Sequence, residues 1–127
     1  MNYVELGKTG LRISYLGLGG IPIQKCSEDG VKALMQKVHQ EGINFIDSAR
    51  GYTVSEALIG EAISGMREDF ILATKSMART YEEMKRDIGI SLHQLKTEVI
   101  ELYQVHNPGI ADLEKVCGKG GALEALL

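Results

Sequence analysis

Residues 42–52 read Gly42-Ile43-Asn44-Phe45-Ile46-Asp47-Ser48-Ala49-Arg50-Gly51-Tyr52. The apolar run Ile43–Asp47 has the length and the aromatic and β-branched content of a buried strand. Gly42 favours the end of a preceding helix, because glycine readily adopts the left-handed conformation needed there. Asp47 ends the strand and Tyr52 follows it by five residues, so the loop after the strand can carry both polar side chains.

The segments on either side repeat this alternation of helix and strand. Tyr3–Leu6 and Arg12–Ser14 are expected to form a hairpin, and strands are expected at Tyr15–Gly20, Ile43–Asp47, Phe70–Thr74 and Val99–Val105. Helices are expected from Ser27 to Gly42, over Ser55–Ser64, and from Thr80, where Thr80 and Glu83 form a capping-box pattern, to Leu95. A further helix is expected to begin within Ala122–Leu127. Each strand is a nearly continuous apolar run, which is typical of a parallel sheet covered by helices. The predicted class is α/β, with residues 1–127 in a single domain.

Composition excludes several classes of protein. The chain has 127 residues, 44% of them hydrophobic, and a net charge of −3, with no basic run of the kind that binds nucleic acid. No apolar run approaches the roughly 20 residues of a membrane span, and the polar N-terminus does not resemble a secretory signal. Cys26 and Cys117 form no CxxC pair, so no metal site is expected and a reducing cytoplasm is the expected location.

Ionisable residues follow three consecutive strands of the predicted sheet. Asp47, Lys75 and His106 each stand where an apolar run ends, and Tyr52 lies in the loop after the first of these runs. The carboxyl ends of parallel strands meet at one edge, where such folds place their chemistry. One interpretation is a single catalytic group. The other is a structural ion pair between Asp47 and Lys75, with His106 and Tyr52 as ordinary loop residues.

Four segments carry a resemblance to a known family. Residues 42–52 resemble the GINFxDTAxxY signature of the aldo-keto reductases. Leu6-Gly7-Lys8-Thr9-Gly10-Leu11, Leu72-Ala73-Thr74-Lys75 and Leu102-Tyr103-Gln104-Val105-His106 are similar to its other N-terminal landmarks, in the same order. The closest likeness is to a prokaryotic branch whose members often carry a ferredoxin-like iron–sulfur segment downstream. In two places where the family usually has glycine, this chain has Thr53 and Lys96.

The resemblance implies a reaction and a role for each of the four residues. The reaction is hydride transfer from NADPH, or from NADH, to an aldehyde or ketone. Tyr52 is implied as the acid that protonates the developing alkoxide, and Lys75 as the cation that stabilises the resulting phenolate. Asp47 would hold Lys75 in place, and His106 would orient the carbonyl oxygen.

Weaker assignments concern the cofactor and the substrate. Gly20, Ile21 and Asp47 are implied to contact the cofactor, with glycine permitting close approach of the backbone. Arg50 and Arg79 lie just after strand ends and could contact an anionic substrate, or they could be plain solvated arginines.

The resemblance also implies a barrel of the (β/α)8 TIM type, of which the chain supplies the first four or so β/α units. A complete barrel takes about 250 residues, so the chain is expected to be the N-terminal half, a fragment with one open face. We expect self-association through that face, and no membrane or nucleic-acid partner. Two alternatives stay open: a nucleotide-binding module without turnover, and a purely structural half-barrel that needs a partner chain.

Overall fold

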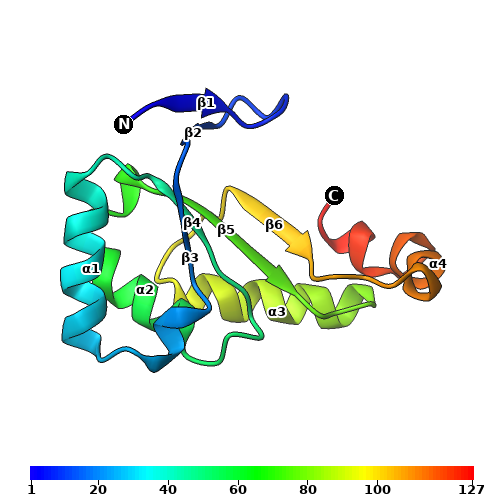
Figure 1. Ribbon diagram of the computed structural model, residues 1–127. Coiled ribbons are helices and arrows are strands. Elements are labelled where there is room, and N and C mark those ends of the chain that lie inside the picture. The colour runs from blue at the N-terminus through cyan, green and yellow to red at the C-terminus, as the bar shows by residue number, and fades with distance from the viewer.

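A parallel four-stranded sheet organises the computed structural model, which describes residues 1–127 (Figure 1). The elements in order are β1 (Tyr3–Glu5), β2 (Arg12–Ser14), β3 (Gly17–Gly19), α1 (Glu28–Gln40), β4 (Phe45–Asp47), α2 (Ser55–Ile63), β5 (Ile71–Ser76), α3 (Tyr81–Gln94), β6 (Leu102–Val105) and α4 (Leu113–Cys117). Short 3-10 helices lie at Pro22–Lys25, Arg67–Asp69, Ile110–Asp112 and Ala122–Ala125. The sheet order is β3-β4-β5-β6, and each of these strands is followed by a helix, so the predicted α/β class and its four β/α units are confirmed.

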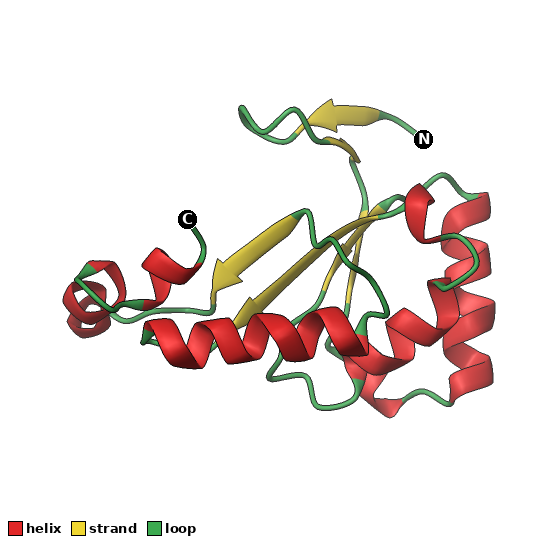
Figure 2. Ribbon diagram, turned by 180° about the vertical axis from the view of Figure 1, so that it is seen from behind, coloured by secondary structure: helices red, strands yellow, loops and turns green.

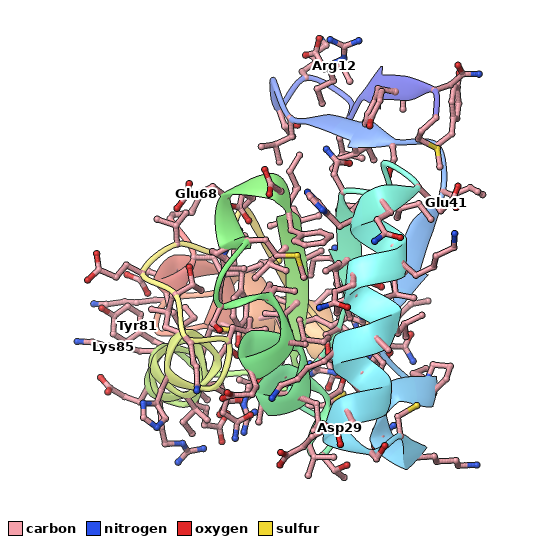
Figure 3. The ribbon with its side chains drawn as sticks, turned by 90° about the vertical axis from the view of Figure 1, so that its left-hand side faces the viewer. Arg12, Asp29, Glu41, Glu68, Tyr81 and Lys85 are labelled. Atoms are coloured by element: carbon pink, nitrogen blue, oxygen red, sulfur yellow. The ribbon has the colours of Figure 1, made fainter.

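The helices α1, α2 and α3 cover one face of this sheet (Figure 2). Alternate strand residues point to that face, because successive side chains of a strand lie on opposite sides. Ile46 and Leu72 are almost completely buried there, in a core shared with Val31, Met35, Val38, Ile59, Ile63, Phe70 and Leu95. Figure 3 shows the opposite, outer surface of α1, where Asp29 and Glu41 point into solvent near its two ends.

The other face of the sheet is only half covered. Phe45, Ile71, Leu102 and Gln104 lie on it and are partly exposed, whereas Ala73 on the same face is buried. The hairpin β1–β2 sits beyond the amino ends of the strands (Figure 1), where Ser14 and Asn44 exchange two hydrogen bonds of 2.7 and 3.0 Å. The carboxyl ends of β4, β5 and β6 are therefore free of the hairpin.

The predicted helix ends are confirmed by their capping contacts. Ser27 accepts a hydrogen bond from the Gly30 N–H at the start of α1, and Thr80 and Glu83 form a reciprocal capping box at the start of α3. Gly42 ends α1 with φ of 75°, and its N–H donates to the His39 carbonyl at 2.9 Å. Each capping residue satisfies backbone groups that the helix itself leaves unpaired.

Several predicted bounds were wrong. β4 begins at Phe45 and not at Ile43, β5 runs to Ser76 and not to Thr74, and the stretch expected to begin a helix at Ala122 forms only a short 3-10 helix.

Two differences have a clear physical reason. The strand expected at Val99–Val105 begins only at Leu102, because Arg67 bonds the Val99 carbonyl at 2.7 Å and the Glu101 carboxylate at 2.8 Å, which takes this segment out of the ladder. The strand expected at Tyr15–Gly20 is reduced to Gly17–Gly19, since the Tyr15 N–H donates to Asn2 beside the hairpin. The α4 helix was not predicted.

Candidate active site

An ion pair joins the ends of two neighbouring strands. Asp47 is the last residue of β4 and pairs in register with Ala73, two residues before Lys75 in β5. The Lys75 Nζ lies 2.8 and 2.9 Å from the two Asp47 carboxylate oxygens and also donates to the Ser48 carbonyl at 2.8 Å. The Lys75 side chain is 12% exposed and the Asp47 side chain 43% exposed, so the pair lies at the rim of the sheet with its carboxylate toward solvent.

Tyr52 is brought over this pair by the loop after β4. The loop is closed by two backbone hydrogen bonds, from Tyr52 to Ala49 at 3.0 Å and from Ser55 to Tyr52 at 2.8 Å. The Lys75 Nζ lies 5.3 Å from the centroid of the Tyr52 ring. A cation at this distance from an aromatic ring interacts favourably with it.

His106 completes the cluster from the third strand. It follows β6 directly, and its backbone N–H donates to the Ser76 carbonyl at 2.8 Å. Its ring lies edge-on to Tyr52, with centroids 5.9 Å apart and planes at 87°. The Nδ1 atom of His106 is buried and has no hydrogen-bond partner. The structure thus brings together all four residues that the sequence singled out.

A buried serine pair supports the loop beneath these residues. The hydroxyls of Ser48 and Ser55 lie 3.0 Å apart, and Ser55 also donates to the Gly20 carbonyl at 3.0 Å. A Cβ on Gly20 would lie 2.8 Å from each hydroxyl oxygen, so packing against the serines requires glycine here. Ile21, the next residue, is 56% exposed on the same rim. The serine pair was not found from the sequence, which marks neither serine as buried.

Arg50 points away from the cluster. Its Nη1 bonds Glu56 of α2 at 2.6 Å and Gln94 of α3 at 2.9 Å, on the helix side of the sheet. Glu56 is 1% exposed and also accepts hydrogen bonds from Thr74 at 2.7 Å and Ser91 at 2.8 Å. The structure therefore groups Arg50 with a buried carboxylate between two helices, a partner that sequence spacing did not indicate.

Tyr103 lies at the edge of this buried network. Its hydroxyl is 3.0 Å from the Ser91 hydroxyl. Burial, which disfavours the charged phenolate, raises the pKa of Tyr103 to about 12. Tyr103 lies on the helix side of β6, opposite the face of Gln104, so its hydroxyl does not belong to the cluster of Tyr52 and His106.

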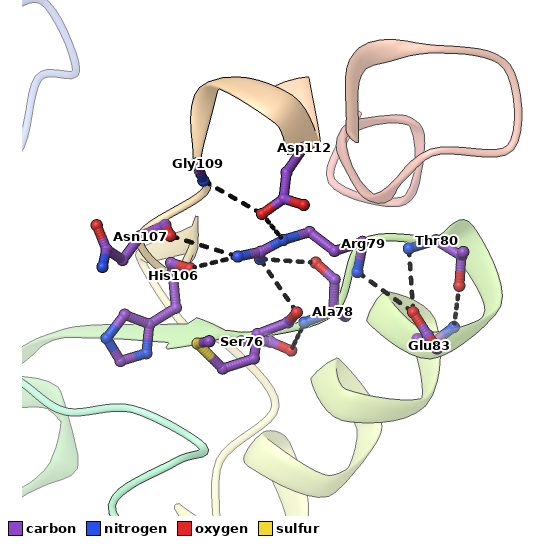
Figure 4. A network of polar contacts seen from close by, with 10 residues as sticks. Ser76, Ala78, Arg79, Thr80, Glu83, His106, Asn107, Gly109 and Asp112 are labelled. Atoms are coloured by element: carbon purple, nitrogen blue, oxygen red, sulfur yellow. Dashed lines mark hydrogen bonds and ion pairs between the residues drawn. The ribbon is translucent and has the colours of Figure 1, made fainter. Parts of the chain in front are cut away.

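Arg79 lies in the loop between β5 and α3, at the same end of the sheet as His106. Figure 4 shows its guanidinium surrounded by acceptors of the chain itself, among them the Asp112 carboxylate at 3.0 Å and the His106 carbonyl at 3.1 Å. Its side chain is 14% exposed. The structure brings Arg79 to the backbone of His106 and to the loop that follows β6.

Other features of the structure lie away from this cluster. A cavity of about 590 Å³ opens at the start of α3, lined by Thr80, Tyr81, Glu82, Lys119, Gly120 and Glu124. It shares no residue with the four clustered side chains. No set of three His, Cys, Asp or Glu residues is arranged to bind a metal ion. No helix is long and apolar enough to cross a membrane.

Comparison with known proteins agrees with the motifs and the geometry. The sequence model of the Aldo/keto reductase family matches residues 15–125. The chain is 28% identical to L-galactose dehydrogenase of Arabidopsis thaliana, over 87% of this chain and 40% of that protein. It is 33% identical to the aldo-keto reductase YhdN of Bacillus subtilis, over 85% of this chain and 38% of that protein. The chain thus spans about 40% of the length of these relatives.

Solved structures agree with this relationship. A putative aldo-keto reductase from Pseudomonas aeruginosa superimposes with a TM-score of 0.82 and 31% identity, covering 89% of this chain and 48% of that one. The holo form of an aldo-keto reductase from Bacillus halodurans gives a TM-score of 0.82 and 30% identity, covering 91% and 45%. The four β/α units correspond to part of the (β/α)8 barrel of these neighbours. The chain belongs to the aldo/keto reductase family of oxidoreductases.

Proposed function

We propose that this chain carries the catalytic group of a reductase that transfers a hydride from NADPH to an aldehyde or ketone. The observation that carries the proposal is the convergence of the Asp47–Lys75 pair with Tyr52 and His106 at one rim of the sheet. These are the residue types that carbonyl reduction requires: a proton donor, a cation beside it and a group that polarises the carbonyl. NADH is the alternative cofactor.

Tyr52 is the proton donor in this proposal. When bound, the nicotinamide supplies the hydride that reaches the carbonyl carbon. The carbonyl oxygen then takes the Tyr52 proton, and the phenolate left behind is stabilised by Lys75 and later regains a proton from water. Asp47 uses both of its carboxylate oxygens to hold Lys75, which keeps the cation under the tyrosine ring. His106 donates a hydrogen bond to the carbonyl oxygen and so favours the charge that develops on it.

Gly20, Ile21 and Asp47 are the proposed contacts to the cofactor. The rim suits a planar ring, because the exposed apolar side chain of Ile21 stands directly after Gly20, whose N–H donates to the Asp47 carbonyl at 2.8 Å. The thiols of Cys26 and Cys117 are free and exposed, which suits a reducing cytoplasm.

We also propose that a second copy of the chain covers the half-exposed face of the sheet. Phe45, Ile71 and Leu102 lie on this face, and β3 and β6 each leave one side of their backbone unpaired. Open parallel edges beside apolar side chains favour association. This assembly is also the second candidate function, a structural or nucleotide-binding half-barrel without turnover.

Titration with NADPH, followed by a turnover assay with an aromatic aldehyde, tests the proposed function. Wild-type chain and Tyr52→Phe are compared, because this substitution removes only the proton donor and the two proteins should bind NADPH equally. The reductase would be supported if the wild type consumes NADPH and if the rate of consumption falls by about 100-fold or more in Tyr52→Phe. Binding without turnover in either protein would favour the nucleotide-binding module, and no binding would favour the structural role.

A further inference from the structure

The side chain of His106 has no hydrogen bond of its own to fix its direction. Its Nδ1 atom is buried and unpartnered, and its contact with Tyr52 is an edge-on ring contact at 5.9 Å between centroids. The direction of the imidazole is therefore set by the backbone that carries it and by packing. Whatever holds the backbone of His106 fixes the direction of its Cα–Cβ bond and so limits where the ring can point.

That backbone is held on two sides. The His106 N–H donates to the Ser76 carbonyl at 2.8 Å, which continues the β5–β6 ladder. The His106 carbonyl accepts from the Nη2 of Arg79 at 3.1 Å, and the Asn107 carbonyl accepts from the same nitrogen at 3.4 Å (Figure 4). The ladder ends at this point, so Arg79 takes over where the sheet stops supporting the chain.

The next residue turns the chain through the left-handed region of backbone conformation. Asn107 has φ of 42°, a conformation that asparagine tolerates better than most residues other than glycine, although at some cost. Two acceptors on one nitrogen of Arg79 flank this residue and hold the turn closed. Without them, relaxation of the turn would rotate the His106 peptide.

The guanidinium is itself firmly anchored. Its Nε donates to Asp112 at 3.0 Å, and its Nη1 donates to the Met77 and Ala78 carbonyls at 3.0 and 3.4 Å. The Asp112 carboxylate also accepts the Gly109 N–H at 3.2 Å, which ties the guanidinium to the far side of the loop after β6. The bond from Arg79 holds the pKa of Asp112 below its usual range, so the carboxylate is charged at neutral pH.

We infer that Arg79 is a positioning residue for His106, acting through the His106 carbonyl and anchored by Asp112. Its role in the reaction rests on the proposed function, whereas its effect on the imidazole does not. All three nitrogens of Arg79 are engaged with acceptors of the chain, which leaves no nitrogen without a partner for an anionic substrate. Its contribution is to aim the imidazole at the place above Tyr52 where a carbonyl oxygen would lie.

The chain offers a matched control in Arg67. Its side chain is also 14% exposed, and it also binds a carboxylate and backbone carbonyls, here Glu101 and the carbonyls of Phe70 and Val99. It joins β5 and β6 at their amino ends, the opposite end of the sheet from His106. Loss of Arg67 therefore removes a similar set of contacts without touching the His106 backbone.

The test is nuclear magnetic resonance of the 127-residue chain without cofactor or substrate. Cross-peaks between the His106 and Tyr52 rings are compared in wild type, Arg79→Met, Arg79→Ala, Asp112→Asn and Arg67→Met. We expect Arg79→Met to lose most of the cross-peak intensity and Asp112→Asn to lose a smaller part of it. Arg67→Met should keep the wild-type intensity, and addition of methylguanidinium to Arg79→Ala, which leaves room for it, should restore part of the intensity.

Unchanged cross-peaks in folded Arg79→Met would overturn the inference. If that variant does not fold, an unchanged Asp112→Asn would overturn it equally. An equal loss of cross-peak intensity in Arg67→Met would overturn the inference as well, because the loss would then reflect a general loosening of the sheet. A chain that fails to turn over NADPH leaves these signals as they are, so failure of the proposed function and failure of the inference are separate results.

Discussion

Lys75 of β5 binds Asp47 of β4, and its Nζ lies 2.8 and 2.9 Å from the two carboxylate oxygens. The register partner of Asp47 is Ala73, so the Lys75 side chain reaches back by two residues along the sheet. A third contact, to the Ser48 carbonyl at 2.8 Å, occupies the remaining N–H of the ammonium group. The ammonium group therefore contacts the Tyr52 ring without a hydrogen bond to the phenol. This arrangement fixes the charge in one place, which a mobile lysine could not do.

The pair of Arg50 and Glu56 gives a prediction that separates a structural role from a substrate-binding role. Glu56 is 1% exposed, and Arg50 is its charged partner at 2.6 Å. Arg50→Met should lower the free energy of unfolding by about 3 kcal/mol, because it leaves a buried carboxylate without its cation. Urea denaturation measures this. The double variant Arg50→Met/Glu56→Met should recover most of the loss, and a fully stable Arg50→Met would contradict the assignment.

A residue in a glycine-like conformation gives the second prediction. Lys96 follows α3 with φ of 52°, and its N–H and that of Thr97 donate to the His93 and Leu92 carbonyls at 3.2 and 3.1 Å. Gly42 ends α1 in the same way with φ of 75°. Lys96→Gly should raise the free energy of unfolding by about 0.5 kcal/mol, since the relief of roughly 1–2 kcal/mol of strain exceeds the lost surface ion pair with Glu61 and the greater freedom of the unfolded chain.

The control for this prediction is Gly42→Lys. It introduces the same strain and places a Cβ 2.9 Å from the Tyr3 hydroxyl oxygen, so it should destabilise the chain by more than 1 kcal/mol. Thermal and urea denaturation of both variants measure the difference. A Lys96→Gly variant that is less stable than the wild type would show that the turn does not store the strain.

Sequence alone predicted most of the sheet and the clustered residues for one physical reason. Strand ends of a parallel sheet meet at one edge, so apolar runs that end in Asp47, Lys75 and His106 were sufficient to place these residues together. The departures from glycine at Thr53 and Lys96 were also visible, and both residues have positive φ, of 43° and 52°. The predictions that failed, among them the start of β6 and the partners of the arginines, depended on contacts between distant segments.

Long-range arginine contacts are the clearest case. Arg67 binds the Val99 carbonyl across 32 residues and so shortens β6, and Arg79 binds Asp112 across 33 residues. An arginine has no periodic pattern that reveals its partner. The sequence therefore left Arg50 and Arg79 as candidate substrate contacts or as solvated arginines, whereas in the structure both bind acceptors of the chain.

The pKa of Tyr103 gives a prediction for alkaline pH. Burial raises this pKa from 10.0 to about 12, so the folded chain keeps the phenol proton in a range where the unfolded chain releases it. The contribution of the buried phenol to the free energy of unfolding is therefore fully present below pH 10, and it is lost as the pH rises from 10 to about 12. Tyr103→Phe should lose less stability across that window than the wild type when both are followed by urea denaturation. Parallel curves for the two proteins would contradict it.

Association through the half-exposed face should depend on concentration. Burying apolar surface contributes about 25 cal/mol per Å², so even a few hundred Å² favour pairing before the entropic cost of association. Sedimentation velocity at micromolar concentration should show a species larger than the 13.9 kDa chain. Leu102→Lys, on this face, should shift the population toward monomer, whereas Leu113→Lys, on α4 and 45% exposed, should not. A monomeric wild type with cooperative unfolding would refute the proposed pairing.

Transfer of deuterium from NADPH labelled at the reactive position of its nicotinamide ring is the most direct test of the proposed chemistry. The wild-type chain, at a concentration where it is associated, is incubated with an aromatic aldehyde, and the alcohol product is analysed by mass spectrometry. The account predicts an alcohol with one deuterium on the former carbonyl carbon, and a rate at least about 100-fold lower for Tyr52→Phe. An alcohol without deuterium, or equal rates for the two proteins, would contradict it.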